Sequence, residues 1–390
     1  MIIPQKIFDN LGDGEIISIS PNRRLFKLSS FHSNPIIKPQ DLGLRGHKQG
    51  DWWPGAVFNP GAEIFNNGII LTPRCHKDYT KVIFFDKQLG IERSGFENYT
   101  SQILPLFSID GVYFKQIDHT SIQGNGTHNK DFRYGIEDIR IIKSKDKYLL
   151  VGCGKIKPPY KGENADRVAI YSTNDFKNIK YHGIIAEFDS RNAIVFPETV
   201  DGKIYMLFRF HPNIHLDFLK AGFDQLLNPK KYKKDWREIY QRKEKNILIK
   251  AGQNPHSKEK VGPGTQLIKT TEGWLLIYHS VGTIERDISN AYGIGSELDR
   301  AYSISVALLD LKNPKKIIAK SKYPVYVPHN PYELSGNKEY PIDVANVVFP
   351  TGALVINDKL LVYAGAGDKY VILLSCHLKK LIDFLLNRKI

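Results

Sequence analysis

The feature that most constrains the fold is a hairpin unit that recurs five times between residues 57 and 375. Each unit has a first strand with small or polar residues, a tight turn and a strongly apolar second strand. Asn66-Asn67-Gly68 and Asp201-Gly202-Lys203 are two of these turns, and such sequences between apolar runs signal hairpins. The first strands begin at Val57, Ile136, Ala193, Gly262 and Val347, and third strands are expected at 82–85, 168–173, 304–310 and 370–375.

Self-similar hairpins at this interval are typical of a β-propeller, in which each unit forms one sheet around a central axis. The sequence therefore predicts an all-β, five-bladed β-propeller, with a β-sandwich carrying an insert as the alternative. No Gly-rich loop precedes a helix, so a dinucleotide-binding fold is not favoured. The expected parts are an N-terminal extension packed on the propeller (1–45), the propeller (46–375) with a basic, helix-containing insertion at 225–249, and a C-terminal helix (376–390).

Charge and cysteine content narrow the choice of partners. The formal net charge is +14, but no nucleic-acid motif accompanies it, so we expect no nucleic acid and either a solvated lysine-rich surface or a field that attracts small anions. No signal peptide and no run of about 18 apolar residues is present, so we expect no contact with a membrane. Three distant cysteines fit the reducing cytoplasm. The basic insertion is a possible interface of a homo-oligomer.

Polar residues of the first strands form the candidate site. Asp138 and Arg140 are two apart and share one face of a strand, so we expect Glu137 on the opposite face. First strands of a propeller ring its axis, so their polar residues converge. The equivalent positions are Asn59, Asp138, Glu198 or Arg191, Lys260 and Thr265, and Asp343 and Asn346, and the second strands add Arg74, Arg209 and His279.

The cations in this set outnumber the carboxylates that face them. Cations that face one another repel, so their convergence predicts an anion from outside the chain, and phosphate fits arginine well. The alternative is that each cation has a local acidic partner. The five cations are Arg74, Arg191, Arg209, Lys260 and His279.

The chain resembles glycoside hydrolase family 130, the mannoside phosphorylases and related mannosidases, from about Asn34 to about Ser375. The resemblance rests on a set of segments in a fixed order, and the family's five-bladed propeller agrees with the repeat count. Ile139 and Thr351 stand where Pro and Cys are common, which leaves the cleaved linkage open. The matching segments are 58–62, 137–140, 191–198, 260–265, 273–279, 306–311, 346–353 and 364–368.

The resemblance implies a role for each candidate residue. Asp138 is implied as the catalytic acid, and the other roles divide between phosphate and sugar. The implied phosphate-binding residues are Arg191, Arg209, Lys260, His279 and Tyr302. The implied sugar-binding residues are Asn59, Arg74 and Asp368, with Glu137 and Arg140 beside the acid. No metal and no cofactor is expected, and inorganic phosphate is the co-substrate.

The implied reaction is inverting phosphorolysis of a β-1,2- or β-1,4-linked mannoside to α-D-mannose 1-phosphate. An inverting glycosidase needs an acid and a base. Phosphate is already an anionic nucleophile, so a phosphorylase needs an acid and a cationic cradle. The alternatives are a β-mannosidase with Glu198 as base, a carbohydrate-binding propeller without catalysis that uses Trp52 and Trp53, and a furanoside-type propeller glycosidase.

Overall fold

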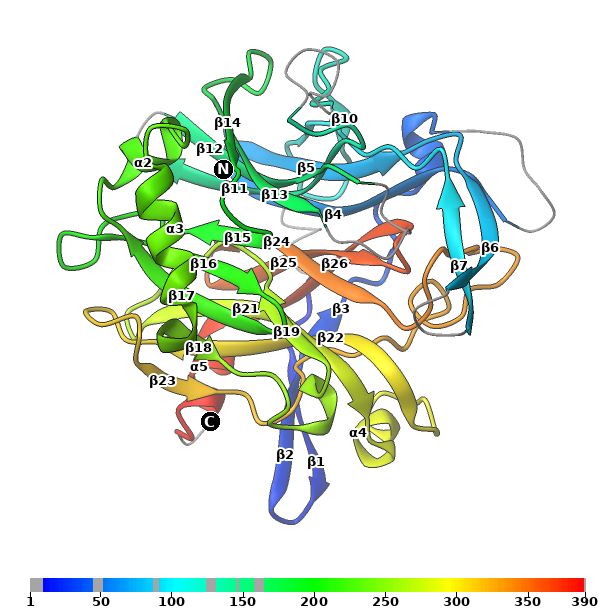
Figure 1. Ribbon diagram of the computed structural model, residues 1–390. Helices are drawn as coiled ribbons and strands as arrows, with labels where there is room; N and C mark the ends of the chain where they lie inside the picture. The colour runs from blue at the N-terminus through cyan, green and yellow to red at the C-terminus, as the bar shows by residue number, and fades with distance from the viewer. Residues whose placement is uncertain are drawn as a thin grey trace.

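Five antiparallel sheets follow one another along the chain and surround one axis, which confirms the predicted five-bladed propeller (Figure 1). This computed structural model describes residues 10–44, 52–86, 91–123, 131–144, 147–157 and 165–388. The sequence also predicts the turn of the second hairpin unit at 145–147, and part of it, like the ends of the predicted terminal segments, lies outside the described residues.

Each blade begins at the axis and runs outward in chain order. Blade one consists of β4 (Ala56–Phe65), β5 (Gly68–His76), β9 (Leu106–Ser108) and β10 (Lys115–Gln116), with β8 (Gln102–Ile103) also paired to β5. Blade two consists of β11 (Ile136–Ser144), β12 (Lys147–Lys155), β13 (Asp166–Thr173) and β14 (Lys180–Ile185). Blade three consists of β15 (Arg191–Val195), β16 (Ile204–Phe210), β17 (Asn213–Leu219) and β18 (Ile247–Ile249).

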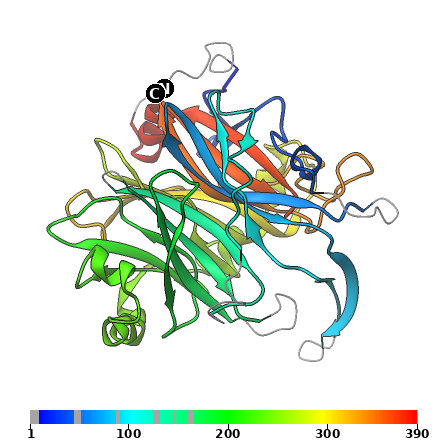
Figure 2. The same cartoon turned by 90° about the horizontal axis from the view of Figure 1, so that it is seen from above.

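The last two blades complete the ring, because β24 (Val348–Ile356) contacts β4, and they are the yellow and the orange-to-red parts of the chain in Figure 2. Blade four consists of β19 (Lys260–Pro263), β21 (Trp274–Ile284), β22 (Leu298–Leu309) and β23 (Ile317–Lys320), with β20 (Ile268–Lys269) also paired to β21. Blade five consists of β24, β25 (Lys359–Ala366), β26 (Tyr370–His377) and β3 (Ser29–Ser30). Because β4 contacts both β11 and β24, the first and last blades lie side by side at the axis.

The outermost strand of blade five comes from the N-terminal part of the chain. β3 pairs with β26, which joins the two ends of the chain in one sheet. Residues 29–30 of the predicted extension are therefore part of the propeller, while its other boundaries stay a prediction. Ahead of β3, β1 (Glu15–Ser20) and β2 (Arg23–Lys27) form a separate hairpin.

Three of the innermost strands carry a β-bulge at equivalent positions. The pairing register shifts between Phe58 and Gly61, between Glu137 and Arg140, and between Arg191 and Ile194. Within these bulges Asn59, Asp138 and Asn192 have φ angles of 50°, 51° and 56°. Asn and Asp tolerate this left-handed conformation better than other side chains that have a Cβ. The bulges interrupt the strict alternation of side chains along the strand.

The predicted third strand of blade one, at 82–85, is wrong. Those residues lie in β6 (Thr80–Asp86), which pairs only with β7 (Ile91–Glu97) in a separate hairpin (Figure 1). Ile83 and Phe85 are 75% and 60% exposed on this hairpin. The apolar, β-branched run identifies a strand correctly, but strand propensity does not specify which strand it pairs with.

Helices lie outside the blades. The predicted insertion is confirmed as helical by α2 (Phe223–Leu227) and α3 (Lys233–Gln241), which connect β17 to β18. Trp236 and Ile239 of α3 are buried in the apolar cluster shared by blades two and three. No helix in the described ranges is long and apolar enough to cross a membrane. The other short helices are η1 (Pro39–Leu42), η2 (Lys243–Asn246), η3 (Pro255–Ser257) and α4 (Arg286–Asn290).

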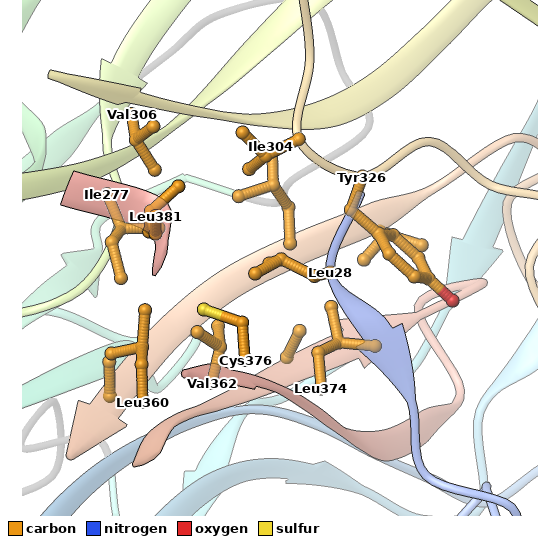
Figure 3. Packing of buried hydrophobic residues seen from close by; sticks show 14 of the residues in the cluster. Leu28, Ile277, Ile304, Val306, Tyr326, Leu360, Val362, Leu374, Cys376 and Leu381 are labelled. Carbon is orange, nitrogen blue, oxygen red and sulfur yellow. The ribbon is translucent and has the colours of Figure 1, made fainter. Parts of the chain in front are cut away.

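The predicted C-terminal helix is confirmed as α5 (Leu378–Leu385), which covers the core between blades four and five. Leu381 is fully buried there beside Ile277 and Leu360 (Figure 3). Leu381→Ala is expected to lower the free energy of unfolding by about 2–5 kcal/mol, because it removes buried methyl groups and leaves a cavity. Chemical denaturation measures this change.

Lys379→Ala is the matched control on the same helix, since the Lys379 side chain is 75% exposed and pairs with Asp383. An exposed pair at this spacing contributes about 0.3–0.5 kcal/mol. Equal losses from the two variants would show that α5 does not cover the core.

Candidate active site

Two carboxylates and two arginines meet where β11 passes the axis. Nη2 of Arg74 lies 2.8 Å from Oε1 of Glu137, and its Nη1 lies 3.7 Å from Oδ1 of Asp138. Nη2 of Arg191 pairs with Glu137 and lies 3.8 Å from Oδ2 of Asp138. Asn59 donates its Nδ2 hydrogen to Oδ1 of Asp138 across 2.9 Å. Three blades therefore contribute to one buried polar cluster.

Glu137 and Asp138 share these arginines, so the expectation that they face opposite sides of the strand is wrong. The bulge and the positive φ of Asp138 turn its side chain away from regular alternation. Both carboxylates are buried, at 1% and 3% exposure. Glu137 thus belongs to the site as a partner of Arg74 and Arg191.

The environment of Asp138 favours its ionised form. Burial raises the pKa of Asp138, but the charges of Arg74 and Arg191 outweigh burial and hold the pKa below its ordinary value. The free protein therefore carries a carboxylate at this position. Any ligand that attracts either arginine away from Asp138 weakens that stabilisation and makes the carboxyl group easier to protonate.

A second cluster next to the first contains cations without carboxylates. Arg209 lies directly opposite Arg191 in the β15–β16 register. Lys260 donates from Nζ to the hydroxyl of Tyr302 across 2.7 Å. In the described part of the chain neither Arg209 nor Lys260 pairs with a carboxylate. His279 is fully buried, and within the same ranges neither of its ring nitrogens has a partner.

Backbone space at Gly262 allows these side chains to approach. A Cβ at Gly262 would lie 2.6 Å from Nε2 of His279 and 2.8 Å from Cδ of Arg209. Glycine is therefore the residue that lets both side chains cross β19.

Uncompensated positive charge perturbs every titratable group of this second cluster. Burial and the neighbouring arginine lower the pKa of Arg209, and burial lowers the pKa of Lys260. Burial and the charges of Arg209 and Lys260 lower the pKa of His279 well below 6.5, so its ring is neutral. Although burial opposes it, the charge of Lys260 lowers the pKa of Tyr302. An anion placed here would relieve this repulsion.

The two alternatives for the cations, a local acidic partner or an external anion, apply to different residues. Local pairing describes Arg74 and Arg191, since Arg191 also lies 3.4 Å from Oδ2 of Asp166 through its Nε. An external anion suits Arg209 and Lys260, together with neutral His279. The structure thus brings all predicted phosphate-site residues together but commits Arg191 to the carboxylates as well.

Arg140 lies at the axis rather than in either cluster. Its guanidinium donates to the carbonyl oxygens of Asp138 at 2.7 Å, Gly264 at 2.8 Å and Pro263 at 3.4 Å. The residue is fully buried. Arg140 therefore ties the bulge of blade two to blade four, and the structure does not bring it to a sugar site.

Other predicted positions serve a surface or a neighbouring network. Glu198 pairs with Lys269, and both side chains are about half exposed, so Glu198 is not a base at the axis. Asp343 forms a buried ion pair with Lys369 at 2.8 Å and accepts the indole hydrogen of Trp52 at 2.8 Å. Three further residues named from the sequence donate hydrogen bonds to backbone carbonyl oxygens: Thr265 to Gln266, Asn346 to Arg300 and Trp53 to Leu44.

Asp368 follows β25 in a left-handed conformation, with a φ of 50°. Burial of its carboxyl group, together with the charges of Asp138 and Asp343, raises its pKa to about 7, although Arg74 opposes this. Asp368 therefore brings a carboxyl group that is protonated over part of the neutral range to the Asp138 cluster.

The raised pKa of Asp368 predicts a pH-dependent stability. The folded protein holds this proton more tightly than the unfolded chain, in which the pKa is near 3.8, so the contribution is fully present below pH 3.8 and is lost as pH rises to about 7. Asp368→Asn cannot ionise. Its melting temperature relative to wild type is therefore expected to rise between pH 4 and pH 8.

Asp175→Asn provides the control, because Asp175 has a pKa of about 2 and its carboxyl group does not titrate between pH 4 and pH 8. A difference in melting temperature between wild type and Asp368→Asn that stays constant from pH 4 to pH 8 would contradict the raised pKa of Asp368.

Asn192 is a site residue that the sequence reading missed. It occupies the bulge position that Asn59 and Asp138 occupy in blades one and two. It is 3% exposed, and neither amide atom has a partner in the described part of the chain. The signal was present in the sequence, because Arg191-Asn192 stands in its unit where Glu137-Asp138 stands in the preceding one.

Comparisons with known proteins agree with this fold. A family model described as beta-1,4-mannooligosaccharide phosphorylase, glycoside hydrolase family 130, matches residues 32–387. A beta-1,2-mannobiose phosphorylase of Thermoanaerobacter sp. is 29% identical over 89% of this chain and 96% of its own length. A 1,2-beta-oligomannan phosphorylase of the same strain is 27% identical over 89% and 96%. The structure of a Listeria innocua beta-1,2-mannobiose phosphorylase superposes with a TM-score of 0.67, at 21% identity, over 93% of this chain and 99% of that one.

Proposed function

Since the chain belongs to glycoside hydrolase family 130 and is an enzyme acting on β-mannosides, we propose that it cleaves β-1,2- or β-1,4-linked manno-oligosaccharides with inorganic phosphate and inverts the anomeric carbon. The products are α-D-mannose 1-phosphate and the shortened saccharide. Asp138 is the general acid of this proposal, and phosphate is the nucleophile.

The observation that carries the proposal is the division of the site into two clusters. One cluster holds Asp138 with its arginines, and the other holds Arg209 and Lys260 without carboxylates. Arg191 touches both, because it contacts Asp138 and lies opposite Arg209. A proton donor next to a cluster of cations suits attack by phosphate on the face opposite the leaving group.

The bond changes follow from this division. A phosphate oxygen, held by the second cluster, forms a bond to the anomeric carbon while the glycosidic C–O bond breaks. The leaving oxygen takes a proton from Asp138, directly or through a hydroxyl group of the sugar, and Asp138 regains a proton from the hydrogen phosphate ion, which loses one as it forms the ester. When Arg191 turns toward phosphate, it loses part of its contact with Asp138. The pKa of Asp138 then rises at the stage when this residue must carry a proton.

The sugar-binding side consists of groups that meet Asp138. Asn59 and Arg74 contact Asp138, and Asp368 lies close enough for the charge of Asp138 to raise its pKa. Asn192 adds an amide group that is free to bond a sugar hydroxyl or phosphate. We assign these four residues to the mannosyl group next to the cleaved bond.

Hydrolysis by the same site would need a second carboxylate that activates water. Glu198 is paired at the surface with Lys269. Both oxygens of Glu137 are engaged in ion pairs, one with Arg74 and the other with Arg191. The positive second cluster favours phosphate over a neutral water molecule, so phosphorolysis is the reaction that we propose.

A two-substrate assay tests the proposal. The purified enzyme is incubated with β-1,2-mannobiose or β-1,4-mannobiose, with and without phosphate, and with a chelator in a parallel series. Mannose 1-phosphate that forms only with phosphate, at a rate that the chelator does not change, is expected for at least one linkage. Phosphate-independent release of free mannose would refute phosphorolysis.

A further inference from the structure

Arg74, which contacts both buried carboxylates, is itself held by a histidine that the proposed mechanism does not use. Nε of Arg74 donates to Nε2 of His76 across 2.8 Å, and His76 is 1% exposed. The two residues are two apart at the end of β5 and share a face of that strand. Since Nε2 accepts this hydrogen bond, the proton of the neutral ring is on Nδ1.

Aromatic rings enclose the imidazole of His76. Tyr99 stacks on it with centroids 3.7 Å apart and an interplanar angle of 12°, and Phe58 lies nearly parallel at 5.9 Å. Tyr79 meets it edge-on at 5.8 Å. Arg74 lies over the rings of Phe58 and Tyr99 as well. The histidine therefore has one packed orientation, and this orientation fixes the direction from which Arg74 is held.

The charges around His76 keep its ring neutral. Burial and the charges of Arg74 and Lys369 lower the pKa of His76 well below 6.5. Ser101 links the ring to Glu137: its Oγ lies 3.4 Å from Nε2 of His76 and donates to Oε1 of Glu137 at 3.0 Å. A neutral acceptor fixes the guanidinium of Arg74 but does not neutralise it. The guanidinium therefore stays positively charged, and its two Nη groups attract the carboxylates of Asp138 and Glu137.

We propose that His76 is a positioning residue for phosphorolysis: it holds Nε of Arg74 so that Nη1 and Nη2 face Asp138, Glu137 and the bound mannosyl group. The inference rests on the proposed function. It predicts that loss of the acceptor affects the sugar side of the reaction and leaves the phosphate side unchanged, because the second cluster has no contact with His76 among the described residues.

Three variants separate positioning from packing. His76→Phe keeps a ring against Tyr99 but removes the acceptor, whereas His76→Gln can place its amide oxygen where Nε2 lies. His215→Phe changes another buried histidine, on β17, outside the site. Kinetics with β-mannobiose and inorganic phosphate are measured for each, together with melting temperature. Should His76→Phe fail to fold, His76→Asn takes its place, because its amide is too short to reach Arg74.

His76→Phe is expected to lower kcat/KM for mannobiose by about 100-fold, as small misplacements of a catalytic group do, with an unchanged KM for phosphate. His76→Gln is expected to recover most of this loss, and His215→Phe to retain wild-type kinetics. Wild-type kinetics in His76→Phe, or equal losses in His76→Gln, would overturn the inference alone. A wild-type enzyme that forms no mannose 1-phosphate would overturn the proposed function and this inference with it.

Discussion

Asp138→Asn is expected to lower the rate of phosphorolysis by about 100- to 10,000-fold, the range that general acid catalysis contributes. Asparagine preserves the shape of the side chain and its bond to Asn59 but has no proton to donate to the leaving oxygen. The chain offers no obvious substitute at this place, since Glu137 is paired with both arginines. Initial rates at saturating mannoside and phosphate measure the effect.

A second aspartate distinguishes loss of chemistry from loss of structure. Asp217 is buried on β17, two strands outward from the bulged strand β15, and is paired with the partly exposed Arg242 at 2.6 Å, so Asp217→Asn weakens an ion pair outside the site. Its turnover is expected to match wild type where the protein is folded. Near-normal phosphorolysis by folded Asp138→Asn would contradict the assignment of the acid.

Arg209→Leu is expected to raise the KM for phosphate by about 10- to 100-fold, which corresponds to the loss of one charged hydrogen bond of about 1.5–3 kcal/mol. The KM for the mannoside should change little, because Arg209 has no contact with Asp138 among the described residues. Arg209→Lys keeps the charge but loses the planar guanidinium that binds two phosphate oxygens. Its KM for phosphate should therefore lie between the values for wild type and Arg209→Leu. Rates measured against phosphate concentration give the change.

Arg191 provides the comparison for Arg209. It contacts Asp138 and Glu137 as well as lying opposite Arg209, so Arg191→Leu should impair both turnover and the use of phosphate. Identical kinetics of Arg191→Leu and Arg209→Leu would contradict the division of the site into two clusters.

Most of the fold can be predicted from the hairpin unit that repeats in the sequence. Turn residues and alternating apolar segments are local properties, so they locate hairpins without knowledge of the tertiary structure. A propeller then brings its first strands together, which is why the sequence predicts that Asn59, Asp138 and Arg191 are neighbours. α5 is equally local, because its apolar residues recur at helical spacing.

Side-chain direction inside the site was less predictable, because it depends on single backbone angles. The bulge at Asp138 places Glu137 beside the same arginines, although an unbroken strand would place it on the other face. The same device in blade three brings in Asn192, which a reading by charge alone passes over. Bulges are set by pairing between strands, and a single strand sequence does not show them.

Partners that come from distant parts of the chain were also missed. Arg140 has the charge and position of a site residue, yet it bonds to carbonyl groups of blade four more than 120 residues away. The 82–85 strand has the propensity for a blade but forms a separate hairpin with β7. Charge and propensity are properties of a residue, whereas these outcomes depend on tertiary contacts.

The central claim is that phosphate, held by cations at the axis, is the nucleophile in an inverting reaction. Proton and phosphorus NMR of wild-type enzyme with β-mannobiose and phosphate tests it most directly, because both products and the anomeric configuration are observed as they form. Inverting phosphorolysis yields one mannose and one α-D-mannose 1-phosphate for each bond cleaved, and no bond is cleaved without phosphate. Two mannose molecules for each bond, released equally well without phosphate, would contradict it.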